Sequence, residues 1–285
     1  MPDMLPSYPY VRMVKTNGKL GAGAARNLGA KHARAPLLLF LDADDNLLSN
    51  DALRRMVDVW NTEGAIVYSD YVHKAYINPD EAVQLNKAGR LIYRDEKSNL
   101  CMVKAHAEDY DCSRAVKQPE PPFYIWNLIT SLVPKVWHDE IGGFDETMPS
   151  WEDWVYWLCM ARAGKCFVRI AEPLVAYRFY TGGRRDAGIQ MHKDLIQYII
   201  SKLKDVPSMG CKCGGKKLER HFRQDRDRRP PEGAERFRRW GVDVYNELIH
   251  AAMLHGRVVC YTTLHRSFHA RHTTRHCWFA SRAVA

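Results

Sequence analysis

The sequence predicts an α/β fold in which strands and helices alternate. Residues 37–41 form an unbroken apolar run, which suits a strand buried on both faces of a parallel sheet. Residues 37–68 then follow the order strand, helix, strand, the unit of α/β folds. With 285 residues, 46% of them hydrophobic, the chain is long enough to bury a sizeable core as one large domain or two small ones.

The first half of the chain shows the clearest pattern. Its expected elements are a strand at residues 10–14, a helix at about 24–33, a strand at 37–41, a helix at 53–60 and a strand at 65–68. Ser49 or Asn50 can cap the second helix, and Gly64 can end it. Residues 71–122 look loop-like, with one plausible strand near residues 91–93.

Pattern returns in the second half. The expected elements there are an ordered stretch at residues 123–133, a helix at 151–163, short strands at 166–170 and 174–179, and a helix at 195–203. Trp154, Trp157, Leu158 and Ala161 read as the core face of the helix at 151–163. Beyond residue 210 we expect a linker, and then one amphipathic helix at about residues 242–254.

An acidic turn follows the apolar strand at residues 37–41. Asp42 and Asp44 stand two apart and can converge on one divalent cation, because loops at the carboxyl ends of strands bind ligands in open α/β sheets. A solvated Asp-rich turn is the commoner explanation for an arbitrary Asp-x-Asp. The buried strand leading directly into three carboxylates favours a metal site.

Two carboxylates, Glu152 and Asp153, open the helix at residues 151–163. With Ser150 as N-cap they resemble a capping box, and acidic residues also suit the positive end of a helix. One of them could instead project into a pocket as a general base. The residues alone leave both interpretations open.

Basic and amide side chains supply further candidates. Arg26 and Asn27 follow the glycines of the first turn, where Arg26 could reach a phosphate or a base. Arg178 could clamp a diphosphate from the loop after the last predicted strand. Solvent-exposed positions are the alternative for both arginines.

Five segments together resemble family 2 glycosyltransferases with the GT-A fold. In chain order they are Gly-Ala-Ala-Arg-Asn-Leu-Gly-Ala at residues 23–30, Leu-Leu-Leu-Phe-Leu-Asp-Ala-Asp-Asp at 37–45, Gly-Gly-Phe-Asp-Glu at 142–146, Trp-Glu-Asp-Trp at 151–154, and Glu-Pro-Leu with Tyr-Arg at 172–178. The resemblance implies a Rossmann-like three-layer sandwich that binds nucleotide-diphosphate sugars.

The resemblance also implies the reaction and its residues. A hexosyltransferase-like enzyme would move a sugar from a nucleotide-diphosphate donor, often a UDP-sugar, to an acceptor hydroxyl with inversion, aided by Mn²⁺ or Mg²⁺. Asp44 would ligate the metal, Asp42 would touch the ribose or the metal, and Asp153 would be the general base. Arg26, Asn27 and Glu152 would lie at the nucleotide sugar and Arg178 near the diphosphate. A glycan, a lipid-linked sugar or a protein could be the acceptor.

The family pattern is incomplete at the N-terminus. Only about ten residues precede the strand that should come third, so we expect a GT-A domain at residues 1–204 that lacks its first β-α units. Many members carry a His after the Tyr-Arg pair, where this chain has Phe179 and Tyr180. Two alternatives remain: a non-catalytic fragment that binds a partner or is inactive alone, and a metal-dependent phosphohydrolase or nucleotidyltransferase.

Nearly all of the net charge of +9 comes from the C-terminal residues 216–285. Residues 216–285 hold 15 Lys and Arg against 7 Asp and Glu, whereas the first 215 residues hold 27 against 26. We expect a linker at residues 205–217 and a poorly structured Arg/His-rich tail at 218–285. The tail either binds nucleic acid, anionic lipid or an acidic partner, or it is unstructured or arises from translation outside the original reading frame. Because no nucleic-acid module is recognisable, nucleic acid is not the expected partner.

No apolar run approaches the ~20 residues of a membrane-spanning helix, and no secretion signal opens the chain, so a cytoplasmic protein, alone or at a membrane surface, is expected. The cysteines predict neither a disulfide framework nor a zinc site. Cys211 and Cys213 flank one Lys near His221, without a second pair at zinc-site spacing. Cys159 and Cys166 are expected to be reduced, buried thiols.

Overall fold

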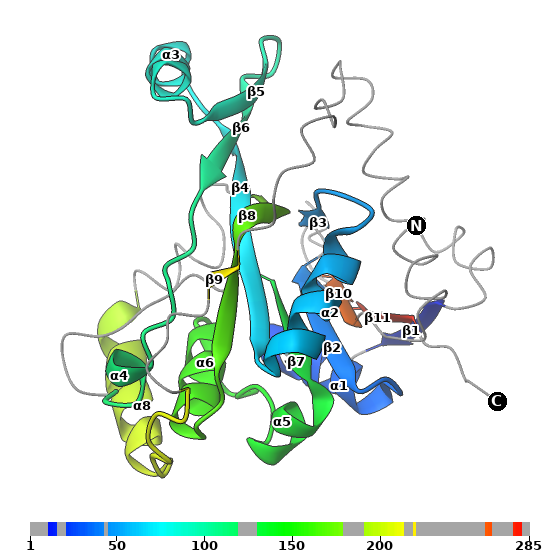
Figure 1. The fold of residues 1–285 in the computed structure, drawn as a ribbon, viewed down its shortest axis with the longest axis vertical. Helices are drawn as coiled ribbons and strands as arrows, with labels where there is room; N and C mark the ends of the chain where they lie inside the picture. Colours follow the sequence, from blue (N-terminus) through cyan, green and yellow to red (C-terminus); the bar gives the residue numbers. More distant parts are fainter. Residues whose placement is uncertain are drawn as a thin grey trace.

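The computed structural model describes residues 11–15, 21–42, 45–118, 130–178, 191–213, 219–220, 260–263 and 276–280 (Figure 1). The elements are, in chain order, β1 (Val11–Lys15), α1 (Ala22–His32), β2 (Leu37–Asp42), β3 (Asn46–Leu47), α2 (Ala52–Glu63), β4 (Ile66–Tyr76), α3 (Pro79–Lys87), β5 (Leu91–Asp95), β6 (Leu100–Ala105), α4 (Cys112–Ala115), β7 (Ser131–Pro134), α5 (Lys135–Glu140), α6 (Glu152–Arg162), β8 (Phe167–Arg178), α8 (His192–Lys204), β9 (Glu219–Arg220), β10 (Cys260–Thr263) and β11 (His276–Ala280). The predicted α/β class is confirmed.

One mixed sheet joins all the described strands. Its main path runs β1-β11-β10-β2-β7-β4-β6-β5, and β8 pairs with β3, β4 and β9. The strand β2 is buried as predicted, but it is parallel to β10 and antiparallel to β7, so its surroundings are a mixed sheet and not the expected parallel one. Because β4 is antiparallel to β7 and parallel to β8, the strands β2, β4 and β8 all point the same way. Their carboxyl ends therefore lie on one edge of the sheet.

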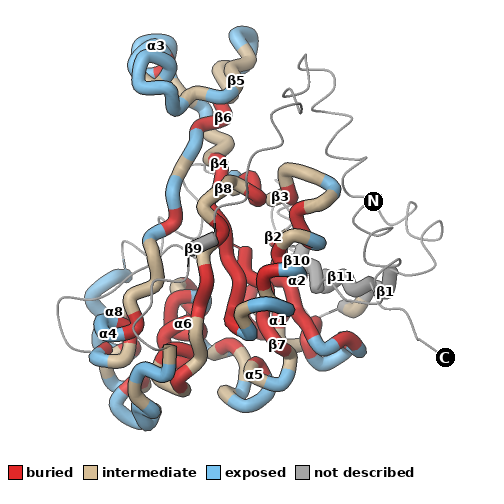
Figure 2. Tube along the Cα trace, viewed as in Figure 1, coloured by how far each residue is buried: buried red, intermediate tan, exposed pale blue. Residues whose placement is uncertain are grey.

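The core lies between this sheet and the helices packed against it. The tube in Figure 2 is buried along β2, much of β4 and most of α6. Every residue of α6 from Trp154 to Ala161 is buried, including the four predicted as its core face. Burial of that many side chains holds α6 in place against the core, and the first residues of the helix are held with it.

Residues 71–118 contain far more regular structure than the sequence indicated. The strand β4 continues to Tyr76 and pairs with β6, while β5 and β6 form a hairpin beside α3 (Figure 1). This outer region has its own small cluster of buried residues, Ala82, Cys101 and Val103. Because so few of its side chains are buried, the sequence carries little hydrophobic periodicity there.

Several predicted boundaries also change. The two strands expected at residues 166–179 are one strand, β8, whose register with β4 shifts beside Asp70. Asp51, rather than Ser49 or Asn50, is the N-cap of α2, and Gly64 ends that helix in the left-handed conformation as predicted. Residues 123–129, Phe179 and the helix expected at 242–254 lie outside the described residues.

Two short strands of the tail, β10 and β11, pair with the sheet between β1 and β2. The division of the chain into domain, linker and tail stays a prediction. No helix among the described ranges combines the length and apolarity needed to cross a membrane.

The cysteines differ from the expectation. Cys112 is bonded to Cys211 and Cys166 to Cys213, so Cys166 is not a reduced thiol and the chain does carry disulfides. Cys159 is free and buried, as expected. The partners are 99 and 47 residues apart, a pairing that no local spacing reveals.

Candidate active site

The guanidinium of Arg26 joins carboxylates from two other elements. Arg26 lies on α1 and is 7% exposed. Its Nη1 donates to Oε1 of Glu152 at 2.8 Å, and its Nη2 donates to Oδ1 and Oδ2 of Asp42 at 2.9 and 3.2 Å. Glu152 opens α6 and is 3% exposed, so this part of the network is shielded from water. The contacts unite residues that are 16 and 126 positions apart.

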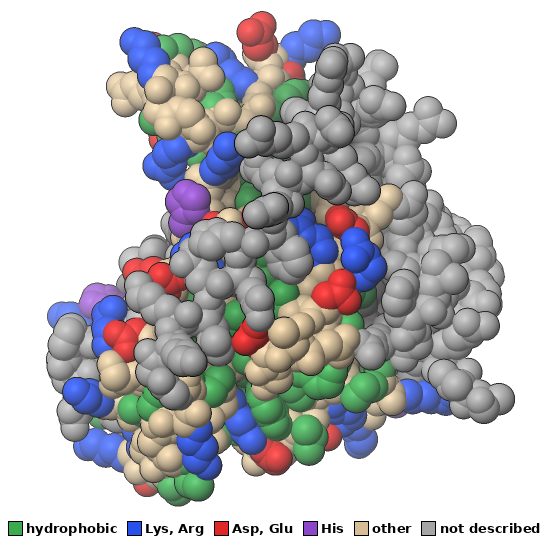
Figure 3. Space-filling model, in the orientation of Figure 1, with side chains coloured by type: hydrophobic (Ala, Val, Ile, Leu, Met, Phe, Trp, Pro, Cys, Tyr) green, Lys and Arg blue, Asp and Glu red, His purple; other side chains and the backbone are tan. Residues whose placement is uncertain are grey.

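Negative charge predominates around Arg26. Burial alone would lower the pKa of the guanidinium, but the charges of Asp42, Glu152 and Asp153 outweigh it and raise the pKa above its ordinary value. Three carboxylates thus surround one permanent cation. A cluster with more carboxylates than cations attracts a further cation, such as a divalent metal ion. On the described part of the face in Figure 3, acidic and basic side chains are interspersed.

Asp153 is the exposed member of this cluster. Its Oδ1 accepts a hydrogen bond from the backbone N–H of Trp154 at 2.8 Å. Among the described residues, no Lys or Arg forms an ion pair with it. Loss of hydration among surrounding protein atoms and, next, the charge of Glu152 raise the pKa of the Asp153 carboxyl; Arg26 acts in the opposite sense. An accessible carboxylate with a raised pKa is a stronger base than an ordinary Asp.

The start of α6 is not a capping box. Trp151, and not Ser150, is the N-cap, and no side chain caps the helix. Trp151 has φ of +61°, a left-handed conformation that is costly for a bulky residue. This unusual turn directs Glu152 inward and leaves Asp153 exposed, as their burial shows. The predicted capping box is therefore absent, although Asp153 accepts from the N–H of Trp154 in the first turn. Strained backbone is more common at functional sites than elsewhere.

Asn27 fastens the Gly-Gly-Phe-Asp-Glu loop to α1. Its Nδ2 donates to the Phe144 carbonyl at 2.8 Å and to Glu146 Oε1 at 2.9 Å, while its Oδ1 accepts from the Phe144 N–H at 2.8 Å. Gly143 has φ of +76°, and a Cβ there would lie 2.5 Å from Asn27 Oδ1. The Asn27 side chain thus holds this loop in place through hydrogen bonds. Its expected contact with the nucleotide stays a prediction.

Phe144 carries this loop into the core beside Arg26. Its ring stacks on Tyr156 of α6 at a centroid distance of 3.9 Å, and the Arg26 guanidinium lies 5.3 Å from its centroid. His138 joins the same aromatic group, with its Nδ1 2.9 Å from the Tyr156 hydroxyl. Burial lowers the pKa of His138 to about 4. The loop therefore braces both Arg26 and the first turns of α6.

The acidic turn after β2 meets the end of β8. The Asp45 N–H donates to the Asp42 carbonyl at 3.0 Å, and the Asp45 Oδ1 accepts from the Arg178 N–H at 2.9 Å. Arg178 is the last residue of β8 and its side chain is exposed. Asp44, the predicted metal ligand, lies outside the described residues. The structure thus brings the predicted residues Asp42 and Arg178 to the same acidic turn.

Two charged residues near this edge were missed in the sequence. Lys74 stands opposite Arg178 in the register of β4 with β8, and its Nζ donates to the Asn46 side chain. Asp70, 2% exposed, contacts His106 Nδ1 at 2.9 Å and accepts from the Ala107 N–H at 3.0 Å. Both lie on the stretch of β4 that continues beyond the predicted strand at residues 65–68, so nothing in their local sequence indicated a site.

Comparison with known proteins agrees with this geometry. A family model described as Glycosyl transferase family 2 matches residues 2–114, the segment that contains Arg26, Asp42 and Asp44. Comparison with curated proteins finds no match. Members of this family have the GT-A fold, and the central sheet with its packed helices is of that α/β type. Through residues 2–114 the chain is similar to glycosyl transferase family 2, whose members are glycosyltransferases that use nucleotide-sugar donors.

Proposed function

We propose that this chain transfers a sugar from a UDP-sugar to an acceptor hydroxyl, with inversion at the sugar carbon and with the help of Mn²⁺ or Mg²⁺. The observation that carries the proposal is the joining of Asp42 and Glu152 by Arg26, with Asp153 exposed beside them. This arrangement sets a candidate base close to the edge of the sheet where the acidic turn follows β2. Donor and acceptor would meet there.

Asp153 acts as the general base in this proposal. Inverting transfer needs a single base to take the proton from the attacking hydroxyl. The exposed carboxylate of Asp153 is accessible to an acceptor, and its raised pKa increases its affinity for that proton. Burial of the following residues of α6 holds its backbone in place, so little ordering is needed when the acceptor binds.

Arg26 acts as a positioning residue. Its guanidinium donates to two carboxylates within the protein, and it fixes the end of β2 relative to the start of α6. Removal of Arg26 would leave the carboxylate of Glu152 buried without its cation. An unpaired buried charge strongly lowers the stability of a folded protein. Arg26 therefore maintains the spacing between the donor side and the base.

Carboxylate oxygens at the acidic turn suit a hard divalent cation. Asp44 would hold the ion, with Asp42 beside it; both oxygens of Asp42 also accept from Arg26, so Asp42 is the more constrained of the two. The metal would neutralise charge on the leaving diphosphate. Arg178, tied to Asp45 through its backbone, is placed to add positive charge near that diphosphate.

Calorimetric titration of UDP with and without Mn²⁺ tests the donor side. We expect Mn²⁺ to strengthen UDP binding to the wild type, Asp44→Ala to lose that gain, and the exposed control Glu96→Gln to keep it. Equal binding with and without metal would contradict the metal dependence. The mechanism is tested separately by NMR of the product: an α-linked UDP-sugar should give a β-linked glycoside, and retained configuration would refute inversion.

A further inference from the structure

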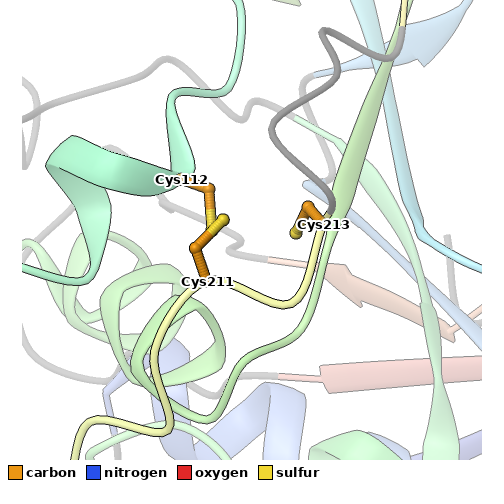
Figure 4. A group of neighbouring side chains, drawn as sticks. All are labelled: Cys112, Cys211 and Cys213. Carbon is orange, nitrogen blue, oxygen red and sulfur yellow. A yellow bond between two sulfur atoms is a disulfide. The ribbon is translucent and has the colours of Figure 1, made fainter.

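Four cysteines from three segments meet at the end of the molecule that holds α4 and α8. Cys112 opens α4, Cys166 immediately precedes β8, and Cys211 and Cys213 follow α8. They form two disulfides, Cys112–Cys211 and Cys166–Cys213, each with a Cα–Cα distance of 5.6 Å. Figure 4 shows Cys112 and Cys211 bonded, with Cys213 beside them. The two disulfides thus form a single group of sulfur atoms.

The spacing of these sulfur atoms suits one metal ion. The Sγ atoms of Cys112, Cys211 and Cys213 all lie within 4.8 Å of one another, and Cys166 is bonded to the third. In a tetrahedral zinc site each Zn–S bond is about 2.3 Å, which puts the sulfurs roughly 3.8 Å apart. Cys166 is not one of these three, so in the reduced chain its side chain would have to turn to bring the fourth thiolate to that spacing.

Hydrogen bonds independent of the disulfides hold the backbone here. Arg162, at the end of α6, donates from Nε and Nη2 to the Val206 carbonyl at 2.9 and 2.6 Å. The Met209 N–H donates to the Arg162 carbonyl at 2.7 Å, and the Ser208 hydroxyl donates to the Val116 carbonyl at 3.4 Å. The segment that leads to Cys211 is therefore anchored to α6 and to the turn after α4. We expect the four thiols to stay close when the disulfides are reduced.

We propose that the reduced chain binds one Zn²⁺ through the thiolates of Cys112, Cys166, Cys211 and Cys213. A dithiol reductant gives each disulfide two electrons and two protons and is itself oxidised to a disulfide. Binding of Zn²⁺ then releases the four thiol protons to water. The metal replaces the disulfides as the link between α4, the start of β8 and the segment after α8. This site is separate from the proposed active site.

The test uses the full chain, reduced with dithiothreitol under argon, freed of small molecules and titrated with Zn²⁺ or Co²⁺. One equivalent of zinc should remain after desalting, and Co²⁺ should give the visible and near-ultraviolet absorption of a tetrahedral four-thiolate site. The oxidised chain should retain none. A reduced wild type that holds no zinc, or a cobalt spectrum without thiolate bands, would overturn the proposal.

Variants locate the metal. The double change Cys211→Ser with Cys213→Ser should lose the bound equivalent, whereas Cys101→Ser, at a buried free cysteine in the outer cluster, should keep it. The tail at residues 218–285 contains seven His and two Cys, which could hold zinc themselves. Zinc retained by the double variant would place the metal elsewhere and refute the assignment. If the double variant does not fold, the wild-type cobalt spectrum decides.

Discussion

Arg26 is shared by Asp42 and Glu152, and this sharing couples the electrostatics of the whole site. Loss of hydration is the main cause of the raised pKa of Asp153; the charge of Glu152 raises this pKa further and Arg26 lowers it, so two neighbouring charges adjust the basicity of the proposed base. The sequence predicted all four charged residues of this group as site residues. It could not predict which carboxylate pairs with Arg26, because burial and distance decide that.

Glu152→Gln tests this coupling. Gln keeps an acceptor for Arg26 but removes a negative charge beside Asp153, so the pKa of Asp153 should fall. Transfer requires ionised Asp153, and activity is lost as pH falls through its pKa; the acidic limb of kcat/KM against pH should therefore move to lower pH. Glu146→Gln, which also keeps its acceptor for Asn27, is the matched control and should leave the limb unmoved. An unshifted limb in Glu152→Gln would contradict the coupling.

His138 predicts a stability change with pH. Burial lowers its pKa from 6.5 to about 4 in the folded chain, so the unfolded chain takes up a proton first as pH falls. That depressed pKa contributes stability above pH 6.5 that is lost between pH 6.5 and 4, with about 2 kcal/mol lost between pH 7 and 5.

Urea unfolding at pH 7 and pH 5 measures that loss. His138→Asn keeps a short side chain that can accept from the Tyr156 hydroxyl but has no titrating group. The variant should be less stable than the wild type at pH 7 and should lose about 2 kcal/mol less on going to pH 5. An equal loss in both proteins would mean that folding does not lower the pKa of His138.

At the scale of elements, the loop at residues 142–146 and the start of α6 position the site. The segments of the first half were predictable because β2 carries an unbroken apolar run and α2 carries apolar residues at helical spacing. The helix α3 was missed because only Ala82 of it is buried. A local signal was present, since Asn78 precedes Pro79 and its side chain accepts from the Glu81 N–H at 2.9 Å. The contacts of Asn27 with the loop required the structure.

Comparing Gly143→Ala with Gly142→Ala separates the cost of left-handed backbone from the cost of a steric clash in that loop. Both glycines have φ near +77°, at +76° and +78°, but a Cβ at Gly142 meets nothing within 4 Å, whereas one at Gly143 reaches Asn27. Gly142→Ala should cost about 1–2 kcal/mol for the left-handed backbone alone. Gly143→Ala should cost roughly 1–3 kcal/mol more, because the Asn27 hydrogen bonds are displaced. Denaturant titration gives both values; equal costs would show that Asn27 does not depend on this close approach.

At the scale of the whole molecule, the candidate site is assembled from both halves of the chain. The matched family segment at residues 2–114 supplies Arg26 and Asp42, while Glu152, Asp153 and Arg178 come from beyond it. The common direction of β2, β4 and β8 brings their ends to one edge. The cysteine group could not be foreseen, because its bonded partners lie 99 and 47 residues apart.

The most direct test of the proposed reaction is release of nucleoside diphosphate by the full chain from a panel of nucleotide sugars, with Mn²⁺ and a panel of hydroxyl acceptors. The wild type should release acceptor-dependent nucleoside diphosphate from at least one donor. Asp153→Asn should lower that rate by about 10²-fold or more, the contribution of a positioned base, while still binding the donor. A rate near that of the wild type in Asp153→Asn, or no acceptor-dependent release with any donor, would contradict the account.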